Sequence, residues 1–228
     1  MDVTETAELT LMADSIRAAM PELDQGDRRI ALAAYRRLAR GRPATVAELS
    51  EDSGVPAAAV EAALGGWPGV YRDSDGRLAG FWGLAVAPLK PEYRLTVGRR
   101  TCYAWCALDT LFIPTFMGGE VSVESACAVS GKRVSFRLVD GALHDPTPAG
   151  AAVSMAVPDR SFGHDVIETF CHRVLFFASS ALGAEWTATH AGTRVISLAE
   201  AFQLGRRLAE ALLPADISQT EGVEASAI

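Results

Sequence analysis

The sequence predicts an α+β fold, in which an N-terminal winged-helix-like three-helix module precedes a mixed α/β domain of short strands and helices. Two observations support this prediction. Helical patterns fill the first part of the chain and end in a hairpin signal, and short β-rich runs follow Pro88–Pro91. We therefore expect a winged helix-turn-helix-like module over residues 1–88, a second domain over residues 89–214 and a disordered tail over residues 215–228.

The predicted module begins with helices and ends with a hairpin. The signals, in order, are the helically spaced Leu9, Met12, Ile16 and Met20 before Pro21, the amphipathic run Asp27–Ala39, the capping pair Thr45 and Glu48 before Gly54, the run from Pro56 to Leu64, and the turn Asp73–Gly76 before Leu78–Leu84. The charge of the predicted module disfavours binding to DNA. Residues 44–64, which would contain the recognition helix, hold no Lys or Arg but four acidic residues. Because an acidic recognition helix repels phosphates, we interpret the module as a packing unit with no nucleic-acid partner.

The second domain is predicted to mix strands with a few helices. The strand candidates are Tyr93–Val97, Gly119–Glu124, Val134–Val139, Ala152–Val157 and Arg173–Ala178. Ala104–Phe112 is apolar almost all round, which predicts a buried helix that ends before Pro114. Ser197 and Glu200 form a capping box that opens a last helix, which Pro214 ends.

Composition restricts the class of protein and its location. The chain has 228 residues, 49% of them hydrophobic, and a net charge of −7, which is typical of a globular protein and disfavours binding to nucleic acid through its overall field. No apolar run approaches the roughly 18–20 residues of a membrane span, and the first residues lack the pattern of a secretory signal. We therefore expect a cytoplasmic protein without a membrane partner, whose four cysteines are reduced.

Cys106 and Asp109 stand three positions apart in the predicted helix Ala104–Phe112. On a helix their side chains share one face, with Cβ atoms roughly 5–6 Å apart. The carboxylate would accept the thiol proton or raise the thiol pKa, whereas a place in the first helical turn would favour the thiolate. The pair therefore suits proton shuttling, although a helix cap or a buried salt bridge to Arg99 or Arg100 also explains Asp109.

The other cysteines have simpler interpretations. Core packing accounts for Cys102 and Cys127, and a four-cysteine zinc site is disfavoured because the chain has no C-x-x-C pair. Cys171 and His172 are adjacent in the β-like run Thr169–Ala178, so their side chains would point to opposite faces and could not easily serve one metal. The chain also lacks phosphate-binding glycine loops, a G-x-S-x-G elbow and an H-E-x-x-H motif, which disfavours nucleotide and hydrolase chemistry.

Over residues 92–213 the sequence resembles the organomercurial lyases, or alkylmercury lyases, of bacterial mercury resistance. The motifs that carry the resemblance are Tyr103–Leu111 (YAWCALDTL), Glu124–Cys127 (ESAC), Thr169–Cys171 (TFC), Val174–Ser179 (VLFFAS), Glu185-Trp186 with His190, Val195–Ser197 (VIS) and Glu200–Gly205 (EAFQLG). His172 is a departure, since some members carry a second cysteine there.

The resemblance implies an enzyme that cleaves the carbon–mercury bond by protonolysis, giving a hydrocarbon and Hg(II), in mercury detoxification. It places the catalytic and mercury-binding residues at Cys106, Asp109 and Cys171, with Cys127 as a structural cysteine. It further implies no cofactor, Hg(II) as a bound product, cytosolic small thiols as partners, and a mercuric reductase as acceptor of Hg(II). Trp105, Phe170 and Phe176 would line an apolar pocket, or belong to the ordinary core.

Two other functions stay open at the level of the sequence. One is a non-catalytic, thiol-based heavy-metal sensor or transcriptional regulator that uses the helix-turn-helix. The other is a lyase-like scaffold for a different soft metal such as copper. Asp109 favours the lyase, because a pure binding site has no need of a proton donor.

Overall fold

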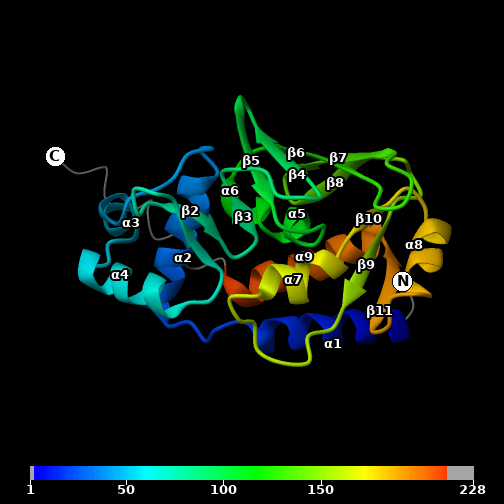
Figure 1. The fold of residues 1–228 in the computed structure, drawn as a ribbon, viewed down its shortest axis with the longest axis horizontal. Helices are drawn as coiled ribbons and strands as arrows, with labels where there is room; N and C mark the ends of the chain where they lie inside the picture. The colour runs from blue at the N-terminus through cyan, green and yellow to red at the C-terminus, as the bar shows by residue number, and fades with distance from the viewer. Residues whose placement is uncertain (1–2, 215–228) are drawn as a thin grey trace.

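The computed structural model describes residues 3–214, which form a mixed α/β fold with antiparallel sheets, as predicted at that level (Figure 1). An eight-stranded sheet has the order β1-β2-β3-β5-β4-β6-β7-β8, and a three-stranded sheet has the order β10-β9-β11. The strands are β1 (Val70–Arg72), β2 (Leu78–Phe81), β3 (Leu84–Ala85), β4 (Tyr93–Val97), β5 (Arg100–Ala104), β6 (Val121–Ala126), β7 (Arg133–Val139), β8 (Ala142–Thr147), β9 (Ala152–Ala156), β10 (Phe176–Phe177) and β11 (Thr193–Ser197). The helices are α1 (Val3–Ala19), α2 (Gln25–Leu38), α3 (Val46–Ser53), α4 (Ala57–Gly66), α5 (Asp109–Phe112), α6 (Pro114–Met117), α7 (Val166–Thr169), the 3-10 helix η1 (Cys171–Arg173), α8 (Ser180–Thr187) and α9 (Leu198–Leu212).

The N-terminal part contains the helices and the hairpin that the sequence predicts. The Thr45–Glu48 capping box opens α3, and Gly54 ends it in the left-handed conformation with φ 65°. The hairpin β1–β2 joins the large sheet through β3, which pairs with β5, so this sheet crosses residue 88. The winged-helix interpretation and the boundary at residue 88 stay predictions, and the predicted tail 215–228 lies outside the described residues.

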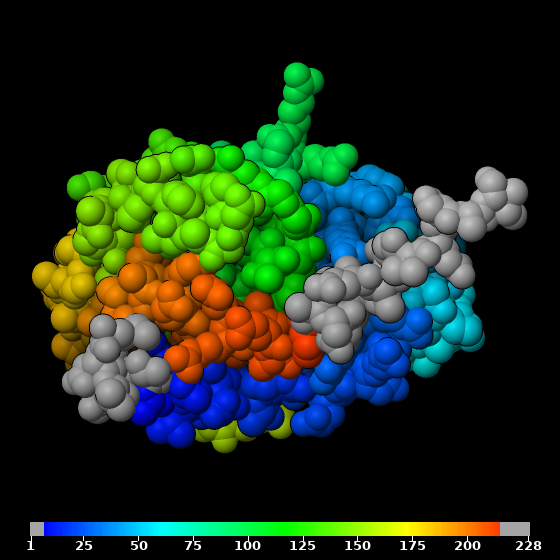
Figure 2. Space-filling model, turned by 180° about the vertical axis from the view of Figure 1, so that it is seen from behind, coloured from blue at the N-terminus to red at the C-terminus, as the bar shows by residue number. Residues whose placement is uncertain are grey.

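Helix α1 packs along α9, so the first and last helices of the described chain lie side by side; Figure 2 shows this from behind, with α1 in blue and α9 in orange to red. Helix α9 also packs on α5 at Gly205, where a Cβ atom would lie only 2.8 Å from the Leu111 carbonyl oxygen. These contacts bury the short helix α5 under α9. No helix within residues 3–214 has both the length and the apolar character required to cross a membrane.

The structure corrects two predicted elements in the second domain. The helix predicted over Ala104–Phe112 is wrong in its first half, because Arg100–Ala104 form strand β5, a turn follows, and helix α5 begins only at Asp109. A fully buried apolar run does not distinguish a helix from a strand followed by a turn. The strand predicted over Arg173–Ala178 is reduced to Phe176–Phe177, because η1 occupies its start.

The other strand predictions are confirmed within two residues of their limits, and Tyr93–Val97 is confirmed as it stands. The last predicted helix corresponds to α9, with the predicted capping box of Ser197 and Glu200. Strands β8 and β11 and helix α8 were not predicted. The two strands carry short or mixed patterns, and pairing with β7 and β9 decides their conformation, whereas the Ser179 side chain caps the start of α8.

We expect Gly205→Ala to lower the free energy of unfolding by about 1–3 kcal/mol, because the added methyl group overpacks the contact between α9 and Leu111. The measurement is urea unfolding followed by circular dichroism. Gly65→Ala in α4 is the matched control, since its Cβ would meet nothing within 4 Å and should leave stability equal or slightly higher. Equal effects of the two substitutions would contradict this account of the α9 contact.

Candidate functional site

The turn between β5 and α5 holds Cys106 against Asp109. The backbone N–H of Cys106 donates to Oδ2 of Asp109 over 2.9 Å, and the hydroxyl of Thr110 donates to the Ala107 carbonyl over 2.7 Å. Asp109 thus reaches back over three residues from the first position of α5 to the turn that precedes it. The predicted proximity of Cys106 and Asp109 is confirmed, although a turn and not a helix produces it.

Cys171 comes to the same place from η1, which follows α7. The backbone N–H of Ala107 donates to the Val174 carbonyl over 3.0 Å, which joins the two cysteine-bearing segments directly. Fully buried Ser154 on β9 donates its hydroxyl to the Arg173 carbonyl over 2.9 Å and accepts the Leu175 N–H over 3.0 Å. These two bonds fix the backbone on either side of Val174, just after Cys171.

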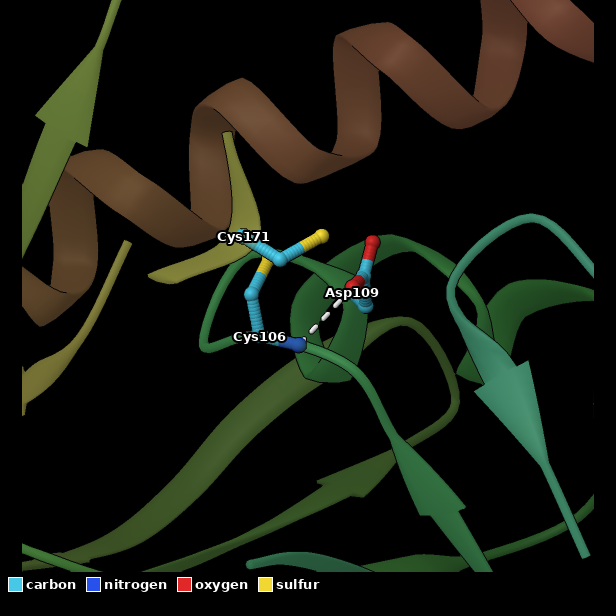
Figure 3. A group of neighbouring side chains, drawn as sticks. All are labelled: Cys106, Asp109 and Cys171. Carbon is cyan, nitrogen blue, oxygen red and sulfur yellow. Dashed lines mark hydrogen bonds between the residues drawn. The ribbon is translucent and has the colours of Figure 1, made fainter. Parts of the chain in front are cut away.

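The structure brings together all three residues predicted to form the site. The sulfurs of Cys106 and Cys171 and a carboxylate oxygen of Asp109 lie within 4.8 Å of one another, and all three residues are buried (Figure 3). No ion pair joins Asp109 to Arg99 or Arg100 in the described part of the chain, so the predicted alternative of a salt bridge is wrong. Two thiolates and one carboxylate can hold a soft metal cation and move a proton beside it.

The remaining cysteines and His172 lie apart from this cluster. Cys102 is buried in β5, and Cys127 lies in a turn where its sulfur accepts the Ser130 N–H over 3.4 Å. His172 is exposed. Because the four cysteines do not converge within the described residues, they form no zinc site there.

Burial sets the protonation of the cluster. It raises the pKa of Asp109 from 3.8 to about 7, against the lowering effect of hydrogen bonds from Cys106 and Trp105. Burial, a hydrogen bond from its thiol to Cys171, and the charge of Asp109 together raise the pKa of Cys106 well above 9.0. The prediction that Cys106 lies in the first turn of a helix, whose dipole would favour its thiolate, is wrong, because α5 begins only at Asp109.

Cys171 is balanced between opposing effects. The hydrogen bond that it accepts from Cys106 lowers its pKa, while burial and the charges of Asp109 and Glu168 together raise it above 9.0. Both thiols therefore carry protons at neutral pH. Thiolates form here when a cation takes the place of these protons.

An apolar pocket of about 60 Å³ opens on Asp109 and Cys171. Of the two alternatives left open for the aromatic residues, Trp105 and Phe170 are among the walls of the pocket, whereas Phe176 packs on Tyr93 and Phe136 in the core. Other walls come from segments that the sequence analysis did not connect with the site: Ile16 and Met20 of α1, Trp82 and Gly83, and Leu208 of α9. The run Leu78–Leu84, predicted as one strand of the hairpin, is divided in the structure by the Trp82–Gly83 turn, across which β2 pairs with β3.

Comparisons with known proteins agree with the resemblance. Residues 88–210 match the family model described as alkylmercury lyase (MerB). Proteins named alkylmercury lyase are similar to this chain: one from Staphylococcus epidermidis is 34% identical over 75% of this chain and 77% of its own length, and one from Streptomyces lividans is 35% identical over 78% and 81%. The fold is that of a solved structure described as the mercury-bound form of MerB2, with a TM-score of 0.69 and 22% identity over 90% of this chain and 99% of the other.

Asp109 gives a prediction for stability as a function of pH. Its pKa is raised in the folded state, so between about pH 4 and pH 7 the folded protein holds a proton that the unfolded chain releases. Wild-type stability should therefore fall through this window relative to Asp109→Asn, which cannot ionise. Chemical unfolding of both proteins at several pH values measures the difference, and a difference that is constant across the window would contradict the raised pKa.

Proposed function

Because the chain belongs to the alkylmercury lyase family, we propose that Cys106, Asp109 and Cys171 form its active site. The chain is a carbon–mercury lyase, which cleaves organomercury compounds to a hydrocarbon and Hg(II). The relatives favour this function over the alternative of a non-catalytic metal sensor. The observation that supports the proposed residues is the convergence of two sulfurs and one carboxylate within 4.8 Å in a buried site.

In the proposed reaction, one cysteine binds the mercury of the substrate as a thiolate and releases its proton with the displaced ligand. The second cysteine then adds to the same mercury, since soft thiolates prefer this soft cation, and it gives its proton to Asp109. Coordination by two sulfurs weakens the carbon–mercury bond. One proton therefore leaves with the displaced ligand and one stays at the site for the carbon.

Asp109 transfers the retained proton to carbon as the carbon–mercury bond breaks. The electron pair of that bond goes to carbon, which leaves as the hydrocarbon, and Hg(II) stays bound to both sulfurs. A carboxyl group whose pKa is about 7 is suited to both accepting and donating a proton near neutral pH. The apolar pocket beside Asp109 and Cys171 accommodates the organic group and limits the access of water.

Partners and location follow as parts of the same proposal. Side chains supply the whole reaction, so it uses no cofactor, and a small cytosolic thiol or a mercuric reductase removes Hg(II) from the two cysteines. The N-terminal module acts as a packing unit, with Arg37 bound to Asp52 and Glu48 and so unavailable to phosphates. A cytoplasmic location and a winged-helix class for the module remain predictions from the sequence.

We expect Cys106→Ser and Cys171→Ser each to abolish release of benzene from phenylmercury in the presence of excess small thiol, because one sulfur cannot activate the carbon–mercury bond. Gas chromatography measures the product. Cys102→Ala is the matched control, since Cys102 is equally buried but lies outside the cluster. Activity retained by either serine variant would remove that residue from the proposed active site.

Asp109→Ala should separate binding from cleavage. Both thiols remain, so phenylmercury binds, while cleavage falls by roughly 10²–10⁴-fold for want of the proton carrier. Mass spectrometry of the intact protein should show the adduct with the organic group still attached. If the variant releases benzene at the wild-type rate, Asp109 is not the proton donor.

A further inference from the structure

A two-residue turn, Trp82–Gly83, lies directly against the Asp109 carboxylate. It connects β2 to β3, and both of its residues have positive φ, 33° and 96°, as in a type I′ hairpin turn. Glycine suits the second position of such a turn for backbone reasons alone.

A Cβ atom on residue 83 would lie 2.5 Å from Oδ1 and 2.6 Å from Cγ of Asp109, and 3.0 Å from Cδ1 of Ile113. Contacts below 3.0 Å do not occur for real Cβ atoms, so one of the two residues has to move. Oδ1 is the oxygen on the Gly83 side, whereas Oδ2 accepts the Cys106 N–H. The space left by the missing side chain is thus filled by the carboxylate itself.

The turn is held more firmly than the carboxylate. The Trp82 carbonyl accepts the hydroxyl of buried Tyr35 over 3.0 Å, and the Gly83 carbonyl accepts the Trp105 N–H over 2.9 Å. The indole N–H of Trp82 donates to the Pro68 carbonyl over 2.8 Å. A methyl group at residue 83 would therefore displace the Asp109 side chain and break its bond to Cys106.

From this geometry we infer that Gly83 is a positioning residue for Asp109: because Gly83 has no side chain, the carboxylate can stay beside the two cysteines, bonded to the Cys106 N–H. The inference rests on the proposed function where it concerns catalysis. The placement of the carboxylate itself is independent of any activity.

Gly83→Ala tests the inference in the full-length protein. We expect kcat for benzene release to fall roughly 10- to 100-fold while KM and binding of phenylmercury stay near the wild-type values, because both thiols are unaffected. In the Asp109→Ala background the same substitution should cause no further loss, since it acts through Asp109. A further loss there, or an unchanged kcat in the single variant, overturns the inference.

Gly76→Ala is the matched control for backbone strain. Gly76 also has positive φ, 76°, in the neighbouring β1–β2 turn, but a Cβ atom there would meet nothing within 4 Å. We expect kcat of this control to equal that of the wild type. A loss as large as that of Gly83→Ala would assign the effect to strain and overturn the inference.

An activity-independent measurement separates failure of this inference from failure of the proposed function. The amide resonance of Cys106 in ¹⁵N-labelled protein reports its bond to Asp109, and Gly83→Ala should shift it toward its position in Asp109→Ala. If Gly83→Ala does not fold, Tyr35→Phe, which removes the hydroxyl holding the turn, should shift the resonance in the same direction with a several-fold loss of kcat. An unmoved resonance in the folded variant overturns the inference whether or not the wild type releases a hydrocarbon.

Discussion

The backbone hydrogen bond from Ala107 to Val174 is the contact on which the site depends. It joins the turn that carries Cys106 to the segment that follows Cys171, over 3.0 Å. Each segment is also fixed separately, by the Asp109 carboxylate on one side and by Ser154 on the other. Side chains on two such turns have little freedom, so the two sulfurs meet because the backbones beneath them are bonded to each other.

Burial of this cluster explains why protons and metal are linked there. A carboxylate and two thiolates placed in an apolar surrounding without a cation would leave charges without compensation. The structure reduces that cost by keeping protons on both thiols, and burial also raises the pKa of Asp109 to about 7, so that its carboxylate readily takes up a proton. In the proposed reaction a mercury cation takes over the role of those protons, and one of them goes to carbon.

The sequence predicted the cluster better than it predicted the local structure around it. The three-residue spacing of Cys106 and Asp109 places the side chains together in a helix, and it does so equally in a capping turn, so the contact was predictable while the element was not. The position of Cys171 came from the resemblance, because no local pattern brings η1 to β5. Gly83 could not be predicted from the sequence, because what distinguishes it is its contact with Asp109, which is distant in the chain.

The residues that line the site come from sequence segments both before and after residue 88, the predicted boundary between the two domains. The family model matches residues 88–210, and these include both cysteines and Asp109. Yet Trp82 and Gly83 line the pocket, and α1 contributes Ile16. The large sheet also crosses the predicted boundary through the pairing of β3 with β5. The N-terminal part therefore completes the enclosure of the carboxylate, and a fragment that starts at residue 89 would expose Asp109 to water on the side where Gly83 now lies.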